Sequence, residues 1–282
     1  MKTFPLGDRA VHRIGFGAMQ LPGRGAFGPP RDRAEALAVV RRAVELGVDH
    51  IDTAQYYGPD VANELLRTAL HPYDARLVLV SKVGAARDAK GGWLPAHEPE
   101  QLRAGVLDNL RSLDVERLDV VNLRVTGADG DFDAQLDAMI AIRDEGLIGG
   151  VGLSNVTLAQ LEHALTRTPV ACVQNPYNLV DRGGEDVLRA CTARDIAFVP
   201  FFPLGAAFGR ERVLGHPAVK ATALRLDVTP AQVALAWILA VAPNTLLIPG
   251  TATLEHLEEN VAAGRVALDD EAMTSLTALT AG

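Results

Sequence analysis

The chain has 282 residues, enough for one large α/β barrel or two ordinary domains, and 48% of them are hydrophobic, which allows a sizeable core. Its net charge of −8 argues against a nucleic-acid partner, because phosphate backbones are bound by basic surfaces. Both cysteines lie in apolar stretches, the N-terminus lacks the apolar core of a signal peptide and no apolar run is long enough to cross a bilayer, so we expect a cytoplasmic protein with a small-molecule substrate and no membrane partner.

The N-terminal residues predict a β-hairpin followed by the first strand of a larger sheet. Two short apolar pieces are separated by Gly7-Asp8, and a strand is expected at 13–20. Residues 21–33 are rich in Gly and Pro and are expected to form a loop over a strand end. This loop contains the spacing G-x-G-x-x-G, but two prolines follow where a phosphate-binding helix would begin. The spacing therefore does not indicate a Rossmann domain.

From residue 33 onward, helical and strand patterns alternate without a break. Apolar residues recur at helical spacing between the strands, and capping signals at Thr157 and Thr229 open two of the helices. Eight apolar strands, each followed by a helix, predict a parallel sheet closed into a single (β/α)8 TIM barrel over residues 1–282, with the N-terminal hairpin at its bottom. After the first, the strands are expected at 48–52, 76–82, 117–124, 146–155, 170–176, 196–205 and 244–250.

Polar and charged side chains stand at nearly every predicted strand end, which is where barrels of this kind carry their chemistry. The stretch 48–58 delivers Asp52 and Tyr57 to one strand end, and Lys82 ends the next strand. An ammonium at about 4 Å from a phenolate, at an effective dielectric near 20, stabilises it by roughly 4 kcal/mol before desolvation. We therefore expect Lys82 to pair with Asp52 and to lower the pKa of Tyr57. The alternative is that Asp52 caps a turn and the tyrosine packs.

These strand ends fall in motifs that together resemble the aldo-keto reductase family, in the expected order over nearly the whole chain. Within this family the stretches GAMQLPGRGAFGPPRDR, DVVNLRV and VPFFPLG are similar to the bacterial pyridoxal reductase branch. The family motifs are DTAQYYG (52–58), VSK (80–82), GLSN (152–155), VQNPYN (173–178), FFPLG (201–205), IPGT (248–251) and HLEEN (256–260).

The resemblance implies hydride transfer from NADPH to an aldehyde, with pyridoxal, reduced to pyridoxine, as the best single substrate. It implies that Tyr57 is the general acid, that Lys82 lowers its pKa and that Asp52 holds Lys82. Arg124 would complete the catalytic set, and no metal is implied. The substrate would contact Gln20, Tyr57, Trp93 and Arg124.

The resemblance also implies where the cofactor lies. Ser154, Asn155 and Gln174 would bind the carboxamide and Phe201 would stack on the nicotinamide. The pyrophosphate would follow residues 201–207. The full set of expected cofactor contacts is Gly17, Met19, Asp52, Ser154, Asn155, Gln174, Phe201, Phe202, Pro203, Leu204, Gly205, Ile248, Gly250, Thr251, His256, Glu259 and Asn260.

Two departures from the family pattern affect this interpretation. Many members have a histidine where this chain has Arg124; an arginine donates hydrogen bonds but keeps its proton, so proton donation would fall on Tyr57. The alternative for Arg124 is an ion pair with a nearby carboxylate. NADP-selective members often carry a cation near the last helix, where this chain has Gly250 and His256, and NADP is still expected over NAD.

Two other functions are compatible with the same residues. One is a reductase of broad specificity for small or aromatic aldehydes. The other is an NADPH-sensing regulatory protein similar to the potassium-channel β subunits, which would bind the cofactor and turn over very slowly. The sequence gives no oligomeric state.

Overall fold

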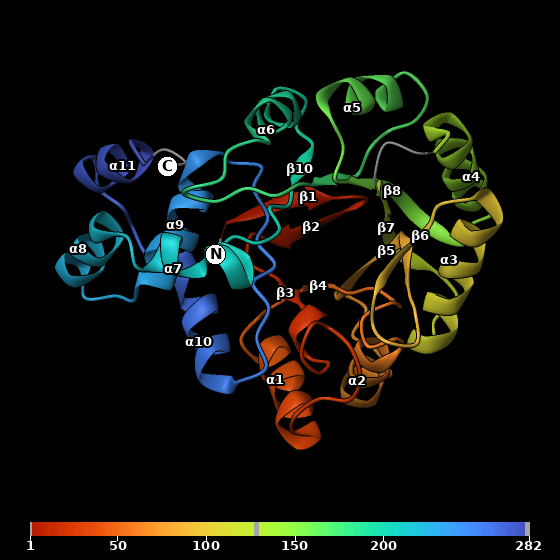
Figure 1. The fold of residues 1–282 in the computed structure, drawn as a ribbon, viewed down its shortest axis with the longest axis horizontal. Helices are drawn as coiled ribbons and strands as arrows, with labels where there is room; N and C mark the ends of the chain where they lie inside the picture. Colours follow the sequence, from red (N-terminus) through yellow and green to blue (C-terminus); the bar gives the residue numbers. More distant parts are fainter. Residues whose placement is uncertain (1, 127–129, 280–282) are drawn as a thin grey trace.

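The computed structural model describes residues 2–126 and 130–279, and its centre is a parallel β-barrel surrounded by helices (Figure 1). Parallel pairing joins the strands in chain order, each to the next, as right-handed β-helix-β units require. The strands are β3 (Phe16–Gly17), β4 (His50–Asp52), β5 (Val78–Arg87), β7 (Leu118–Arg124), β8 (Ile148–Ser154), β9 (Cys172–Gln174) and β10 (Ala197–Phe198).

The barrel closes through residues 244–248, which lie between β10 and β3. Phe198 forms a parallel bridge with Thr245, and Ile14 forms one with Leu247. The Leu247 carbonyl accepts from the Gly15 amide at 2.8 Å. The strand expected at 244–250 is thus present as single bridges, which fill the eighth strand position. The predicted (β/α)8 barrel is confirmed.

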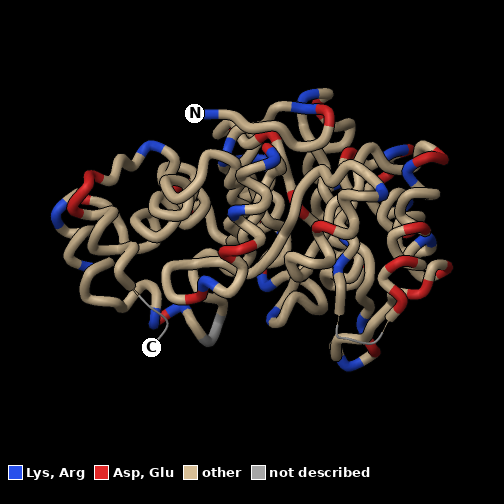
Figure 2. Tube along the Cα trace, turned by 90° about the horizontal axis from the view of Figure 1, so that it is seen from above, with Lys and Arg blue, Asp and Glu red and all other residues tan. Residues whose placement is uncertain are grey.

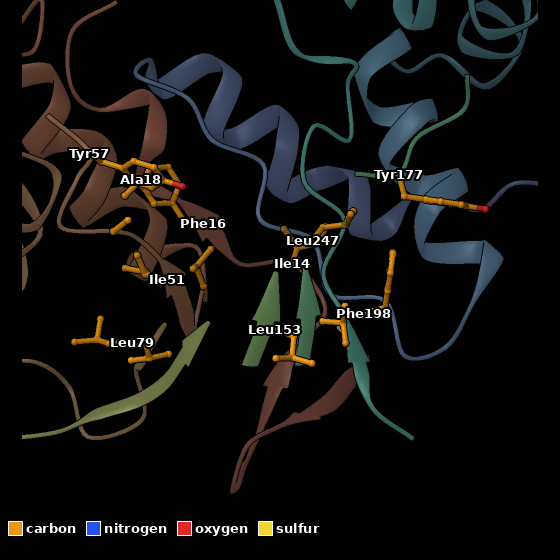
Figure 3. Packing of buried hydrophobic residues seen from close by; sticks show 14 of the residues in the cluster. Ile14, Phe16, Ala18, Ile51, Tyr57, Leu79, Leu153, Tyr177, Phe198 and Leu247 are labelled. Atoms are coloured by element: carbon orange, nitrogen blue, oxygen red, sulfur yellow. The ribbon is translucent and has the colours of Figure 1, made fainter. Parts of the chain in front are cut away.

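The outer layer consists of the predicted helices. Capping boxes open α5 and α9 at Thr157 and Thr229, as the sequence predicts. Apolar side chains on the outward faces of the strands, such as Ile51 and Leu153, pack with these helices in one large cluster (Figure 3). The helices are α1 (Arg33–Glu45), α2 (Val61–Leu70), α3 (Pro99–Leu113), α4 (Phe132–Asp144), α5 (Leu158–Leu165), α6 (Glu185–Thr192), α9 (Pro230–Val241) and α10 (Leu254–Ala262).

A second apolar cluster fills the lower part of the barrel interior. The hairpin of β1 (Thr3–Leu6) and β2 (Arg9–His12) supplies Leu6 and Val11 to it. These two side chains meet inward-facing residues near the starts of the strands, including Val78. The hairpin therefore closes the bottom of the barrel, as predicted, and leaves the other end for polar side chains.

Several predicted boundaries are wrong. The strand expected at 13–20 is only β3, followed by the 3-10 turn η1 (Ala18–Gln20), and the strand expected at 196–205 is only β10 followed by turns. Trp93 lies on β6 (Trp93–Ala96), a strand that the sequence did not indicate, which pairs antiparallel with the extension of β5 beyond Lys82. Further elements that the sequence did not indicate are α7 (Ala206–Leu214), α8 (Pro217–Leu226), η2 (Ala263–Arg265) and α11 (Asp270–Thr277).

Lys and Arg residues are interspersed with Asp and Glu residues along the chain (Figure 2). Within the described residues no single helix is long and apolar enough to cross a membrane, and only α8 and α9 together, bent by 96°, meet that length and composition. The same residues contain no group of three or more His, Cys, Asp or Glu side chains arranged to hold a metal ion.

Candidate active site

Because side chains alternate between the two faces of a strand, polar side chains point into the barrel above the second apolar cluster. Val78 and Val80 of β5 point inward, so Lys82, two residues later, points inward as well. The same alternation on β7 places Asn122 and Arg124 on the inner face. The interior thus changes from apolar at the bottom to polar at the strand ends.

Asp52 and Lys82 form a buried ion pair at this polar end. The Lys82 ammonium donates to one carboxylate oxygen of Asp52, and to the Thr53 carbonyl at 3.0 Å. Gln174 donates from Nε2 to the other Asp52 oxygen at 2.6 Å. Both charged side chains are only 4% exposed, so each depends on these contacts to replace the water that it has lost.

Tyr57 lies in the turn after β4, buried beside this pair. The Lys82 Nζ lies 5.0 Å from the centroid of the Tyr57 ring, over its face. Burial, and next the Asp52 charge, raise the pKa of Tyr57 well above its ordinary value, and the charges of Arg124 and Arg87 oppose this only in part. The prediction of a lowered pKa is therefore wrong, because it counted the Lys82 ammonium without the cost of burial and without the negative charge of Asp52.

Arg124 ends β7 with a guanidinium that makes no salt bridge to any residue in 2–126 or 130–279. Its Cζ lies 5.8 Å from the centroid of the Phe201 ring. Its charge opposes the rise in the pKa of Tyr57 that burial and Asp52 cause. The alternative interpretation of Arg124 as the partner of a nearby carboxylate has no support in this part of the chain.

Two buried polar atoms at the same end lack hydrogen-bond partners among the described residues. They are Ser154 Oγ and Gln174 Oε1. Because an unpaired buried polar atom costs about 1–3 kcal/mol, such a pair at a barrel mouth suits a bound group with its own donors and acceptors, such as a carboxamide. Asn155, expected with them, is exposed and donates from Nδ2 to the Val125 carbonyl at 2.9 Å.

The strand ends at Gly17 and Gly250 approach each other closely. A Cβ built on Gly250 would lie 2.6 Å from the Gly17 carbonyl oxygen, and one on Gly17 would lie 2.5 Å from the Ile248 oxygen. Only glycine fits at either position. Their presence thus has a packing reason, whether or not a cofactor lies against them.

The remaining expected cofactor residues lie between β10 and the end of α10 in the chain, except Met19, which lies on η1. Phe201 and Phe202 stand edge to face, and Phe202 has a positive φ of 55° and is exposed. Thr251 is buried, and its Oγ1 accepts from the Thr253 amide at 3.2 Å, ahead of α10. Of the others, Asn260 is buried, Met19, Pro203, Leu204, Gly205, Ile248 and Glu259 are partly buried, and His256 is exposed.

On the opposite rim, Trp93 packs edge to face on Tyr56 with 5.6 Å between ring centroids. Tyr56 has a buried hydroxyl without a partner among the described residues, and its ring centroid is 5.4 Å from that of Tyr57. Gln20, on η1, is exposed. The Tyr56 ring therefore lies between Tyr57 and the expected substrate residue Trp93 and contacts both.

Comparison with known proteins decides the family. The model of the aldo/keto reductase family matches residues 13–281. The chain belongs to the aldo-keto reductase family. It is 46% identical to pyridoxine 4-dehydrogenase of Escherichia coli over 97% of this chain and 96% of that protein. It is 39% identical to an uncharacterized oxidoreductase of Schizosaccharomyces pombe, over 97% and 88% of the two chains.

Solved structures agree with this assignment. An aldo/keto reductase from Klebsiella pneumoniae, crystallised with NADP and acetate, superposes with a TM-score of 0.81 at 29% identity, over 98% of this chain and 94% of that one. The barrel predicted from the sequence is thus the aldo-keto reductase barrel.

The sequence did not indicate how this aldo-keto reductase fixes the loop over its mouth. Arg87, on the extension of β5, donates to the carbonyls of Gly91 and Ala26 at 2.7 and 2.9 Å. Its guanidinium also stacks on Trp93 at 3.5 Å from the ring centroid. Arg87 thereby joins the loop after η1 to the β5–β6 hairpin. Only its place on a strand that continues past Lys82 could have signalled this role.

Proposed function

We propose that this chain reduces aldehydes with NADPH and that its substrate is pyridoxal, which it converts to pyridoxine. The observation that carries the proposal is the buried Asp52–Lys82 pair beside Tyr57, at the barrel end where Ser154 and Gln174 hold unpaired polar atoms. The family assignment and the 46% identity to pyridoxine 4-dehydrogenase support it. The finer substrate assignment rests on that relative alone.

The side chains suit a nicotinamide cofactor at this end. Ser154 and Gln174 would hold its carboxamide through the atoms that now lack partners, and Phe201 would pack on the ring. When bound, the cofactor supplies a hydride to the carbonyl carbon. Two Klebsiella structures contain NADP or NADPH, which supports NADPH over NADH for this chain.

Tyr57 would donate its phenolic proton to the oxygen that becomes the alcohol. A phenol is protonated at neutral pH at its ordinary pKa, and still more so with the raised pKa of Tyr57, so the proton is present whenever substrate binds. The Lys82 ammonium beside the ring would stabilise the phenolate left behind. Burial of the Tyr57 phenol excludes water that would compete for its proton.

We also place the activity in the cytoplasm, where both buried cysteines would stay as the free thiols they are here.

Replacing Tyr57 with Phe tests the assignment. We expect turnover with pyridoxal, followed as NADPH consumption, to fall by about 10²- to 10⁴-fold, the usual contribution of a general acid. The dissociation constant of NADPH, measured by its fluorescence, should change little because the ring is kept. Unchanged turnover would contradict the role of Tyr57.

A panel of aldehydes, with NADH as the cofactor control, separates pyridoxal reduction from broad aldehyde reduction. The proposal expects a higher kcat/KM for pyridoxal than for simple aliphatic and aromatic aldehydes. Equal values across the panel would replace the pyridoxal assignment with the broad one.

A further inference from the structure

We propose that Arg124 selects aromatic aldehydes that carry an ionised hydroxyl group next to the carbonyl, and that its guanidinium binds both oxygens at once. This proposal rests on the proposed function and names the substrate feature that the site recognises. Pyridoxal is one such aldehyde, and salicylaldehyde is the simplest.

The first support is the state of the guanidinium. Arg124 is only partly exposed, yet within 2–126 and 130–279 it makes no salt bridge and no hydrogen bond through its side chain. Its contact with Phe201 is through the face of the ring, which leaves the N–H edges of the guanidinium free. A partly buried cation of this kind gains most from an anion that a ligand brings.

The second support is that the other cations near Tyr57 already have partners. Lys82 is held by the Asp52 carboxylate and the Thr53 carbonyl. Arg87 is held by backbone carbonyls of the mouth loops. Among the described residues around Tyr57, therefore, Arg124 is the cation whose donors are available to a substrate.

The third support is the match in shape between the Arg124 guanidinium and the two oxygens of an ionised ortho-hydroxy aldehyde. A carbonyl oxygen has two lone pairs, so one can face the Tyr57 hydroxyl while the other faces Arg124. In an ortho-hydroxy aldehyde the ionised oxygen lies on the same edge of the molecule as the carbonyl oxygen, much as the two oxygens of a carboxylate do. The planar fork of a guanidinium binds such an edge with two hydrogen bonds, and a histidine at this position would offer fewer donors.

Recognition of this kind would make the enzyme prefer aldehydes with an ionised ortho hydroxyl, although these are intrinsically the less reactive hydride acceptors. An ionised ortho oxygen donates electrons into the ring and makes the carbonyl a poorer hydride acceptor. A cation bound to both oxygens withdraws that density and stabilises the alkoxide as it forms. The structure thus assigns to Arg124 a preference that the free aldehydes do not have.

The experiment compares salicylaldehyde with 2-methoxybenzaldehyde, which has a similar shape and no ionisable hydroxyl. With the unaltered enzyme and NADPH, we expect kcat/KM for salicylaldehyde to exceed that for the methoxy compound by about 10- to 100-fold, the range of a charge-assisted hydrogen bond. The ratio should rise from mildly acid to mildly alkaline pH as the hydroxyl ionises. In Arg124→Met the ratio should fall to one or below and should no longer rise with pH, because the intrinsic reactivity of the ionised aldehyde is the lower of the two, and Arg124→Lys should retain part of the preference.

Circular dichroism and NADPH binding verify that each variant is folded, and the ratio in the unaltered enzyme tests the proposal even where a variant does not fold. A ratio near one at every pH in the unaltered enzyme would overturn the proposal, and so would a high ratio that survives in Arg124→Met. The proposed function fails separately, if pyridoxal is reduced no better than simple aldehydes while the salicylaldehyde ratio stays high.

Discussion

At the scale of single residues, the charge on Asp52 acts on two neighbours, the Lys82 ammonium and the Tyr57 phenol. Its carboxylate compensates the buried Lys82 ammonium, and the same negative charge raises the pKa of Tyr57. A buried pair of this kind contributes little net stability, but removal of one partner leaves the other charge desolvated and unpaired. The carboxylate therefore keeps the cation beside the phenol and, together with burial, opposes ionisation of the phenol.

Asp52→Asn should expose this dependence. We expect the free energy of unfolding, measured by urea titration, to fall by about 3–5 kcal/mol because Lys82 loses its only carboxylate partner among the described residues. The control is Asp269→Asn, which makes the same chemical change in the exposed pair with Arg225 and should cost about 1 kcal/mol or less. Equal losses in the two variants would show that the buried pair has no special role.

At the scale of elements, a buried chain of amides and hydroxyls fixes β4 and β5 to the helices behind them. Asn109 of α3 accepts from Ser81 at 2.6 Å and from Asn63 of α2 at 3.0 Å. Asn63 in turn accepts from Thr53 at 2.7 Å. Ser81 precedes Lys82, and the Thr53 carbonyl binds its ammonium, so this chain sets the position of Lys82 from both sides.

Asn109→Ala should therefore affect both stability and activity. Removal of an acceptor shared by two buried donors should lower the free energy of unfolding by about 2 kcal/mol or more. A shift of the Lys82 strand should also lower kcat/KM roughly tenfold.

Asn244→Ala is the matched control for this variant. Asn244 is equally buried, accepts from Thr192 at 2.8 Å and donates to the Ile196 carbonyl at 2.8 Å, and does not contact Lys82 or its strand neighbours. It should lose comparable stability and keep its kcat/KM. An activity loss of the same size in both variants would refute a positioning role for Asn109.

At the scale of the whole molecule, the sequence was sufficient for features set by local periodicity. The alternation of strands and helices gave the barrel, and the ends of the strands gave the inward position of Lys82 and Arg124. Packing between distant segments was not readable in this way. The strand at 244–250 has too few paired residues to be continuous, and Arg87 joins the β5–β6 hairpin to a loop about 60 residues away along the chain.

The electrostatics of the site could be predicted only in part for the same reason. The residue types and strand positions indicated which charges would meet. The direction of the Tyr57 pKa depends on how deeply the turn after β4 is buried, which is a property of the assembled barrel and its surrounding loops. Burial also sets the direction of the pKa shift of the other tyrosines in the chain.

The chain contains four tyrosines, and burial raises the pKa of every one, at positions 56, 57, 73 and 177. In the unfolded chain the phenols ionise near pH 10, so from about pH 10 upward the folded state binds more protons than the unfolded state. Stability should then fall as pH rises, by about 1.4 kcal/mol per pH unit for each phenol, with no such contribution below that range. Tyrosinate absorbance and circular dichroism, followed together during alkaline titration, should change in one cooperative step, whereas the chain in urea should titrate near pH 10. A tyrosinate signal near pH 10 with the circular dichroism intact would contradict the burial of these phenols.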